Sequence, residues 1–317
     1  MKILNVSISP HIRSGRTTTK VMLDVIIAMS PAMIFGYFYF GWRALLISVL
    51  SVSSCVLTEF VYEKIMKLPV TVGDLSAVVT GLVLAMCLYS TAPWWIPVVG
   101  GVFAILVVKM LFGGIGQNFM NPALTARCFL ILSFSRIMTD YPTITDGITS
   151  ATPLAAAAKG EFVSYTTLLF GNHSGSIGET SALAILLGAA YLIIRRVISP
   201  RIPLYVIGST IVFVAVFTLM KGETPVTLNY LSVQIMGGGL LAGAVFMATD
   251  YTTSPVTKWG RTIYGIAVGL ITAVIRCFGS PEGISFAIIM ANLLTPMIEK
   301  LTYPKPLGTY GRKAEKQ

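Results

Sequence analysis

The sequence predicts an all-α polytopic membrane protein with about ten transmembrane helices, and three observations support that prediction. The chain has 317 residues, of which 55% are hydrophobic and 11% charged, less than half the roughly 25% charge of a soluble domain. Apolar runs recur along the chain at lengths close to the roughly 20 residues that a bilayer-crossing helix needs. Basic residues gather on alternate connections between these runs, as membrane topology requires.

Ten apolar runs bounded by charged residues, Pro or Gly are the predicted spans. The first half of the chain supplies Val21–Phe40, Ala44–Tyr62, Leu75–Tyr89, Trp94–Phe112 and Pro122–Phe134. The second half supplies Ser181–Ile198, Pro203–Met220, Tyr230–Ala248, Thr262–Phe278 and Ile284–Leu301. The third and fifth runs are short for a full crossing, so we expect them to be tilted, broken or lined by neighbouring helices.

The stretch Met1–Lys20 is polar and basic without an apolar core, so we expect no cleavable signal peptide and a cytoplasmic amino terminus. Ten spans then bring the carboxyl terminus to the same side. Basic residues gather on the two tails and on the connections after the second, fourth, sixth and eighth spans. Of the 23 basic residues, those left on the opposite side are Arg43, Arg136, Lys159, Lys221 and Arg276. The positive-inside rule therefore favours both termini in the cytoplasm.

The long connection Ser135–Thr180 divides the chain into three parts, and structureless loops of about 45 residues are usually functional. Residues 1–134 form a cytoplasmic amino-terminal tail and the first five-helix half. Residues 135–180 form an extracytoplasmic loop, and residues 181–317 form the second five-helix half with a cytoplasmic carboxyl-terminal tail. An odd number of spans in each half would make the halves inverted. The similar stretches Gly73–Ala77 and Gly178–Ala182 leave such a repeat open.

The loop contains the stretch Asp146–Pro153, which reads Asp-Gly-Ile-Thr-Ser-Ala-Thr-Pro. On composition alone this is a turn followed by a helix start. The stretch also resembles the covalent flavin attachment signal of bacterial flavoproteins, in which an Asp precedes the acceptor Thr of an Ala-Thr pair by six residues. The resemblance implies that Thr152 accepts FMN through a phosphodiester, with Asp146, Ser150 and Ala151 completing the motif. Thr149 and Ser150 are the neighbouring hydroxyls to exclude.

Further motifs occur in order along residues 5–308. They are Ser9-Pro10-His11, Gly113–Gly116, Asn121-Pro122-Ala123, Gly178–Ala184, Phe246–Asp250, Gly260-Arg261, Ile275-Arg276, Pro281-Glu282-Gly283 and Ala291-Asn292. Together they resemble the D-subunit family of the Rnf ion-translocating oxidoreductases, which is related to the B component of the sodium-pumping NADH:quinone reductase. One departure is Ser150, which stands where the family more often has Gly. Because Ser is also small, the departure leaves the attachment motif usable.

The resemblance implies a membrane subunit of a complex that passes electrons between ferredoxin and NAD and couples them to Na⁺ or H⁺ translocation. It implies covalent FMN as an electron relay, a flavin transferase for maturation, and partner subunits A, B, C, E and G. The expected location is the cytoplasmic (inner) membrane of a bacterium or archaeon, in contact with lipid and with the flavin loop outside. The chain is not expected to be active alone.

Ionisable residues inside predicted spans are costly and are therefore functional candidates. Arg127 and Asp250 stand out, and with Asn121, Thr249 and Asn292 they could frame a second, non-covalent flavin or an ion path. The family resemblance suggests riboflavin for that flavin. The structural alternatives are an arginine that reaches to the membrane interface and an aspartate that caps a helix end.

Several classes of function are excluded or left as alternatives. The four cysteines and two histidines show no metal-ligand spacing, so neither a metal site nor a catalytic residue is assigned to this chain. No phosphate-binding loop, dinucleotide fingerprint or iron–sulfur pattern occurs, so NAD and ferredoxin should bind other subunits. Nucleic acid is not an expected partner, because the basic residues are dispersed. A solute channel or transporter and a non-conducting scaffold for redox subunits remain the alternative functions.

Overall fold

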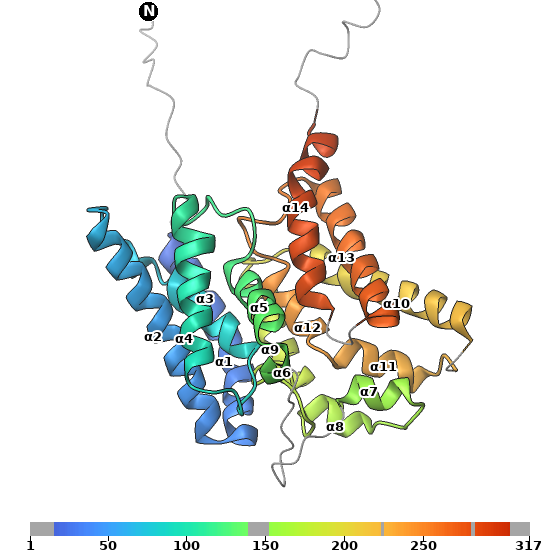
Figure 1. Ribbon diagram of the computed structural model, residues 1–317. Helices are drawn as coiled ribbons and strands as arrows, with labels where there is room; N and C mark the ends of the chain where they lie inside the picture. The colour runs from blue at the N-terminus through green and yellow to red at the C-terminus, as the bar shows by residue number, and fades with distance from the viewer. Residues whose placement is uncertain (1–15, 139–151, 223–224, 280–282, 305–317) are drawn as a thin grey trace, which may run out of the picture.

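The computed structural model describes residues 16–138, 152–222, 225–279 and 283–304, and the secondary structure in these ranges is helical (Figure 1). The first half contains α1 (Thr18–Phe40), α2 (Trp42–Ile65), η1 (Val72–Asp74), α3 (Ser76–Met86), α4 (Trp95–Val102), η2 (Phe103–Lys109), η3 (Met110–Phe112) and α5 (Pro122–Ser133). The middle contains α6 (Ser135–Met138), α7 (Pro153–Ala158) and α8 (Tyr165–Phe170). The second half contains α9 (Ala182–Ile194), α10 (Arg201–Lys221), α11 (Leu228–Met236), α12 (Leu240–Ala242), η4 (Gly243–Met247), α13 (Lys258–Phe278) and α14 (Ile284–Thr302).

Each of the ten predicted spans coincides with a helical segment, so the predicted fold class is confirmed. Six segments in the described part of the chain are long and apolar enough to cross a membrane, namely α1, α2, the continuous stretch Trp95–Phe112, α10, α13 and α14. The eighth span is bent by 54° between α11 and the segment Leu240–Met247. The remaining three are the short apolar helices α3, α5 and α9.

The sixth predicted span, Ser181–Ile198, is shorter in the structure than the sequence suggested. Ser181 caps the amino end of α9 by accepting a hydrogen bond from the backbone N–H of Ala184, and the helix closes after 13 residues. Arg196 then adopts a left-handed conformation with φ of 54°. A helix of this length spans about 20 Å, against roughly 30 Å of hydrocarbon. The helical part of this predicted span is therefore shorter than a full crossing, as it is in α3 and α5.

The short helices meet non-helical backbone that is buried inside the protein. After α3, residues Cys87, Leu88 and Tyr89 are fully buried. The N–H of Ile177 donates to the carbonyl of Leu88 (2.9 Å), and the N–H of Gly178 donates to that of Met86 (3.1 Å). Irregular backbone is tolerated at membrane depth only where protein surrounds it and satisfies its polar groups. The stretch that precedes α9 therefore supplies hydrogen-bond donors to the backbone carbonyls where α3 ends.

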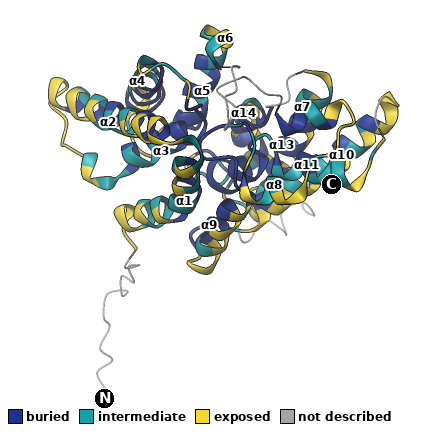
Figure 2. Cartoon of the chain, turned by 90° about the horizontal axis from the view of Figure 1, so that it is seen from below, coloured by how far each residue is buried: buried dark blue, intermediate teal, exposed yellow. Residues whose placement is uncertain are grey.

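Buried residues concentrate in the middle of the molecule, and exposed residues lie on its outer helices (Figure 2). The exposed side chains on the outer faces are largely apolar, for example Val49 and Leu57 of α2 and Leu204 and Val212 of α10. A continuous apolar exterior around a packed centre suits a lipid environment. In Figure 1, α7 and α8 lie at the opposite end of the molecule from the carboxyl end of α14.

The start of α1 and the end of α9 are held together by polar contacts. The guanidinium of Arg16 donates to the backbone carbonyls of Arg195 and Arg196, both at 3.1 Å. Arg195 also forms an ion pair with Asp24 of α1 (3.3 Å), and the hydroxyl of Tyr191 donates to the same carboxylate (2.9 Å). The first and sixth spans therefore begin and end on one side, as the predicted topology requires. Which side of the membrane that is stays a prediction.

Gly188 allows α1 and α9 to pack closely, because a Cβ atom at this position would lie 2.1 Å from the carbonyl oxygen of Ala28. We expect Gly188→Val to lower the free energy of unfolding by about 2 to 3 kcal/mol, since overpacking forces the helices apart. Thermal unfolding of the purified protein in detergent measures this loss. Gly208→Val on α10 is the matched control, because a Cβ atom at Gly208 would have no other atom within 4 Å. Equal effects of the two substitutions would contradict the prediction.

Candidate functional site

A cavity of about 100 Å³ lies where α1, α3, η2, α5, α9 and η4 meet, and we call it the inner cavity. Part of its wall is apolar, with Val25, Val83, Leu192 and Phe246 among the lining residues. The polar part of the wall includes Ser76, Lys109, Asn118, Asn121, Thr249 and Asp250. Asn121, Thr249 and Asp250, which the sequence grouped as a second flavin site or ion path, therefore line one cavity.

Asn121 is fixed at the wall because it caps the amino end of α5. Its Oδ1 accepts hydrogen bonds from the N–H groups of Ala123 (3.1 Å) and Leu124 (3.3 Å), and Pro122 occupies the first helical position, as is common. Its Nδ2 donates to the carbonyl of Met247 (3.4 Å) at the end of η4. The cap therefore joins α5 to the eighth span at the edge of the inner cavity.

Asp250 follows η4 in a turn that closes the cavity. Its Oδ2 accepts hydrogen bonds from the hydroxyls of Thr252 (3.0 Å) and Thr253 (3.2 Å). Burial raises the pKa of the Asp250 carboxyl, and these hydrogen bonds partly oppose that effect. The hydroxyl of Thr249 donates to the carbonyl of Val245 (2.6 Å). Both predicted residues thus face the cavity from one short segment.

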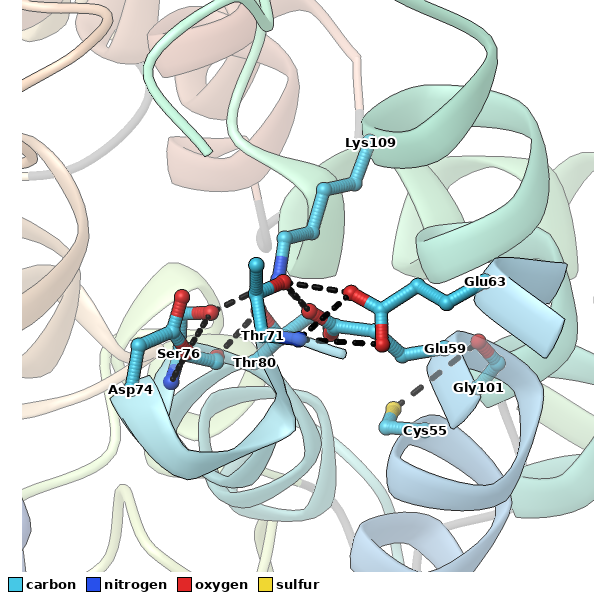
Figure 3. Close-up of polar contacts among 9 residues, drawn as sticks. All are labelled: Cys55, Glu59, Glu63, Thr71, Asp74, Ser76, Thr80, Gly101 and Lys109. Atoms are coloured by element: carbon cyan, nitrogen blue, oxygen red, sulfur yellow. Dashed lines mark hydrogen bonds and ion pairs between the residues drawn. The ribbon is translucent and has the colours of Figure 1, made fainter. Parts of the chain in front are cut away.

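The cation on the wall of the inner cavity is Lys109, which sequence reasoning missed together with its partner Glu59 (Figure 3). The Nζ of Lys109 donates to Oε2 of Glu59 (2.7 Å) and to the hydroxyl of Ser76 (2.6 Å). Lys109 is 3% exposed and Glu59 is fully buried. Both residues lie inside or at the end of apolar runs, so the rule that charged residues within spans are functional candidates could have found them.

A cluster of polar contacts surrounds the Lys109 ammonium (Figure 3). The hydroxyl of Ser76 donates to Oδ1 of Asp74 (2.5 Å), whose carboxylate also accepts from the N–H of Ser76 (2.8 Å). Buried Glu63 accepts the N–H of Thr71 at 3.0 Å and also its hydroxyl. Each carboxylate in this cluster accepts a hydrogen bond. The contacts to Glu59 and Ser76 hold the Lys109 ammonium in one place.

Thr152 lies in a separate small pocket, which we call the outer pocket. It is 8% exposed and caps α7, accepting a hydrogen bond from the N–H of Ala155 (3.4 Å). The pocket has a volume of about 10 Å³, and it is also lined by His173, Ser174, Ser176, Glu179, Gly238 and Gly239. The other members of the predicted attachment motif, Asp146, Ser150 and Ala151, lie outside the described residues.

His173 contributes an imidazole to the outer pocket. Its Nδ1 is 3.0 Å from the carbonyl of Ser174, whereas its buried Nε2 has no hydrogen-bond partner among the described residues. Burial lowers the pKa of this imidazole, and backbone hydrogen bonds to Ser174 and Thr180 oppose the shift. Because a carbonyl oxygen can only accept, Nδ1 of the neutral imidazole carries the hydrogen and Nε2 is a hydrogen-bond acceptor.

Arg127 does not line the inner cavity with the residues that the sequence grouped with it. Arg127 is 1% exposed, and its Nη1 donates to Oε1 of Glu179 (3.1 Å) and to the hydroxyl of Ser285 (2.9 Å). The other carboxylate oxygen of Glu179 accepts from the hydroxyl of Ser176. Because Asn121 begins α5 at the inner cavity and Glu179 lines the outer pocket, the Arg127–Glu179 pair links α5 to that pocket.

At the break in the eighth span, a charged side chain lies at each of the two helix ends. Arg276 donates to the carbonyl of Gln234 in the last turn of α11 (2.6 Å) and to those of Gly237 (3.2 Å) and Gly238 (3.2 Å) just after it. At the start of α12, a Cβ on Gly239 would meet the carboxylate of Glu179 at 2.6 Å, so the carboxylate lies against the helix amino end. A cation at a helix carboxyl end and an anion at an amino end are the favourable arrangement.

Asn292, the fifth residue of the predicted group, is buried behind the inner cavity. The hydroxyl of Tyr264 hydrogen-bonds to its side-chain amide at 2.7 Å, and the residue does not line the cavity. In the described part of the chain, no group of three or more His, Cys, Asp or Glu residues is arranged to hold a metal ion. The structure thus brings together Asn121, Thr249 and Asp250, and it places Arg127 and Asn292 elsewhere.

Comparison with known proteins gives matches along nearly the whole chain. The family model described as "NQR2, RnfD, RnfE family" matches residues 5–308. The D subunit of the Na⁺-translocating ferredoxin:NAD⁺ oxidoreductase complex of Acetobacterium woodii is 47% identical, with 98% of each chain covered. The D subunit of the proton-translocating ferredoxin:NAD⁺ oxidoreductase complex of Clostridium ljungdahlii is 36% identical, with 97% of each chain covered. The D subunit of the ion-translocating oxidoreductase complex of Halorhodospira halophila is 34% identical, with 94% of each chain covered.

Proposed function

Because the chain belongs to the NQR2, RnfD and RnfE family, we propose that it is the D subunit of an ion-translocating ferredoxin:NAD⁺ oxidoreductase complex. The observation that carries this proposal is the end-to-end identity of 47% with a relative of that name. The proposal covers either coupling ion, because one relative is named for Na⁺ and another for protons. The chain acts with the other subunits of the complex, A, B, C, E and G, rather than alone.

The second part of the proposal is that Thr152 carries FMN through a phosphodiester made by a flavin transferase. The hydroxyl oxygen of Thr152 accepts the N–H of Ala155, and an ester oxygen keeps that acceptor role. Thr152 lines the outer pocket together with Ser174, whose hydroxyl can donate to a phosphate oxygen. At about 10 Å³ the pocket admits a water-sized group, so the ring system would lie outside it. When attached, the flavin supplies one- and two-electron transfer, and the protein fixes its position.

We expect Thr152→Ala to abolish covalent flavin. The measurement is ultraviolet fluorescence of the denatured protein in a gel, after expression in cells that contain the flavin transferase. The wild-type band should fluoresce and the Thr152→Ala band should not, because no other hydroxyl occupies the acceptor position. Thr149→Ala is the matched control from the same motif and should fluoresce like the wild type. A dark wild-type band, or a bright Thr152→Ala band, would refute the attachment.

The third part of the proposal is a non-covalent flavin such as riboflavin in the inner cavity. A flavin ring has an apolar dimethylbenzene end and a polar pyrimidine end, and the cavity likewise has an apolar and a polar wall. Asn121, Thr249 and Asp250 supply amide, hydroxyl and carboxylate groups at the polar wall. The volume of about 100 Å³ is below the roughly 300 Å³ of typical ligand sites, so the walls would have to separate on binding.

The complex is proposed to reside in the cytoplasmic membrane, with both termini of this chain in the cytoplasm and the 135–180 loop outside. The distribution of basic residues supports this orientation. It would put the outer pocket on the extracytoplasmic side and the inner cavity on the cytoplasmic side. A solute channel has less support, because the relatives that match the chain from end to end are named as oxidoreductase subunits.

A further inference from the structure

We propose that a pocket at the start of α2 binds the phosphate group of an anionic phospholipid, and we call it the interfacial pocket. Its lining includes Trp42, Arg43, Leu46, Ser90 and Trp94. Its volume of about 280 Å³ is close to the roughly 300 Å³ at which typical ligand sites begin. Within the described part of the chain it shares no lining residue with the inner cavity or the outer pocket, so binding there is independent of either proposed flavin.

The interfacial pocket lies where membrane-crossing helices end. α1 ends at Phe40, Gly41 turns the chain with φ of 71°, and α2 begins at the next residue. The crossing segment Trp95–Phe112 begins directly after the pocket residue Trp94. In Figure 1 the connection from α1 to α2 lies at the end of the molecule opposite the carboxyl end of α14. Trp42 and Trp94 are 70% and 67% exposed, and exposed tryptophans at span ends are typical of the lipid headgroup level.

The wall of the interfacial pocket favours negative charge. Among the described residues that line it, the charged one is Arg43. Its side chain is exposed and has no hydrogen-bond or ion-pair partner in the ranges that the structure describes. The amino ends of α2 and α4 also meet the pocket, and neither has a side-chain cap or an acidic residue in its first turn. Helix amino ends carry partial positive charge and offer N–H donors, so they add to the attraction of an anion.

Ser90 supplies a buried hydroxyl that the protein itself leaves open. The residue is only 7% exposed and lines the pocket, yet its hydroxyl forms no hydrogen bond with any described residue. Buried polar groups in native proteins normally have a partner, so this open hydroxyl indicates that a ligand occupies the pocket. A hydroxyl and a guanidinium both donate hydrogen bonds to phosphate oxygens. Ser90 and Arg43 therefore provide a buried and an exposed donor to one phosphate group.

The apolar part of the wall favours a lipid over a free phosphate ion. Leu46 lines the pocket and is 38% exposed, and Val49, one turn further along α2, is 58% exposed. An acyl chain attached to the bound phosphate can cover this face of α2, whereas a free ion would leave it bare. A headgroup with net negative charge suits the pocket better than a zwitterionic one, because the latter brings its own cation close to Arg43.

The experiment measures phospholipid binding to the full-length protein after removal of native lipid in detergent. Dioleoyl-phosphatidylglycerol is titrated, and native mass spectrometry gives the dissociation constant of the first lipid bound. Arg43→Gln and Ser90→Ala should each weaken this binding by about tenfold, as the loss of one hydrogen bond to a charged group implies. Without lipid, both variants should unfold at the temperature of the wild type, because neither side chain has a described partner to lose. The weakening then reports on binding and not on folding.

Three controls test the specificity of the interfacial pocket. Lys159→Gln removes an exposed basic residue that is predicted on the same side but does not line the pocket, and it should bind phosphatidylglycerol like the wild type. Dioleoyl-phosphatidylcholine should bind the wild type several-fold more weakly, and glycerol 3-phosphate should not displace bound phosphatidylglycerol at equal concentration.

Four outcomes would overturn the proposal. Wild-type affinity in both Arg43→Gln and Ser90→Ala would mean that the pocket does not hold the phosphate. An equal loss in Lys159→Gln would show a general effect of surface charge. Equal binding of phosphatidylcholine would remove the selectivity for a net negative headgroup. Displacement by glycerol 3-phosphate would identify a site for soluble phosphate esters and not for a lipid.

Discussion

Lys109→Met is expected to lower the free energy of unfolding by about 3 to 5 kcal/mol, the usual cost of removing one partner from a buried ion pair. Glu59 is fully buried and its carboxylate would lose the ammonium at 2.7 Å. The hydroxyl of Thr71, at 3.5 Å, is too distant to replace it. The neighbouring carboxylate of Glu63 is also buried, so the remaining charge would be repelled as well as desolvated.

Thermal unfolding in detergent, followed by tryptophan fluorescence, measures this effect as a decrease of roughly 5 to 10 °C in the midpoint. The double variant Lys109→Met/Glu59→Gln should recover most of the loss, because it leaves no buried charge without a partner. Recovery in the double variant distinguishes an ion pair from simple packing of the lysine side chain. A single variant as stable as the wild type would mean that Glu59 finds another donor or is neutral.

Much of this fold could be predicted from local sequence patterns. Hydropathy located all ten spans, because the lack of water in a bilayer leaves apolar helices as the available spanning structure. The ends of helices were harder to predict from the sequence, as α9 shows. Its length is set by the Ser181 cap and by the turn at Arg196, and both lie within a run that the sequence predicts as one continuous span. Composition gives the length of a run, and capping geometry gives the length of a helix.

The candidate sites were only partly predictable, because pairing across the fold leaves no local signature. Asn121, Thr249 and Asp250 were grouped correctly in space, since they line one cavity. Arg127 was grouped with them because it follows Asn121 by six residues, yet its side chain contacts Glu179, 52 residues further on. Lys109 and Glu59 are 50 residues apart, and neither sequence neighbourhood indicates the other. Which buried charge pairs with which is decided by the packing of helices.

The two sites are connected through α5 and the second half of the fold. Asn121 at the start of α5 borders the inner cavity, and Arg127 further along the same helix reaches the outer pocket through Glu179. Glu179 in turn lies against the amino end of α12, whose continuation η4 leads back to the inner cavity at Thr249 and Asp250. A continuous path of contacts through α5, one ion pair and the segment from α12 to η4 therefore joins the two sites.

The ion pair in this connection is the second position where a large effect is expected. Arg127→Met should lower the free energy of unfolding by about 3 to 5 kcal/mol, because the Glu179 carboxylate would stay buried with the Ser176 hydroxyl and the weakly donating Cys87 thiol but no cation. Glu179→Gln should cost a comparable amount, since it leaves a buried guanidinium with the Ser285 hydroxyl. The double variant Arg127→Met/Glu179→Gln should be more stable than the sum of the single losses implies.

The matched control is the ion pair Arg195–Asp24, which has a similar distance of 3.3 Å but an Arg195 side chain that is 56% exposed. Arg195→Met should change the free energy of unfolding by about 1 kcal/mol or less, because water screens exposed pairs. Thermal unfolding of the five proteins, including the wild type, gives the comparison directly. If Arg127→Met and Arg195→Met lower the midpoint equally, burial does not determine the strength of the Arg127–Glu179 pair, and its role in joining the two sites would have to be abandoned.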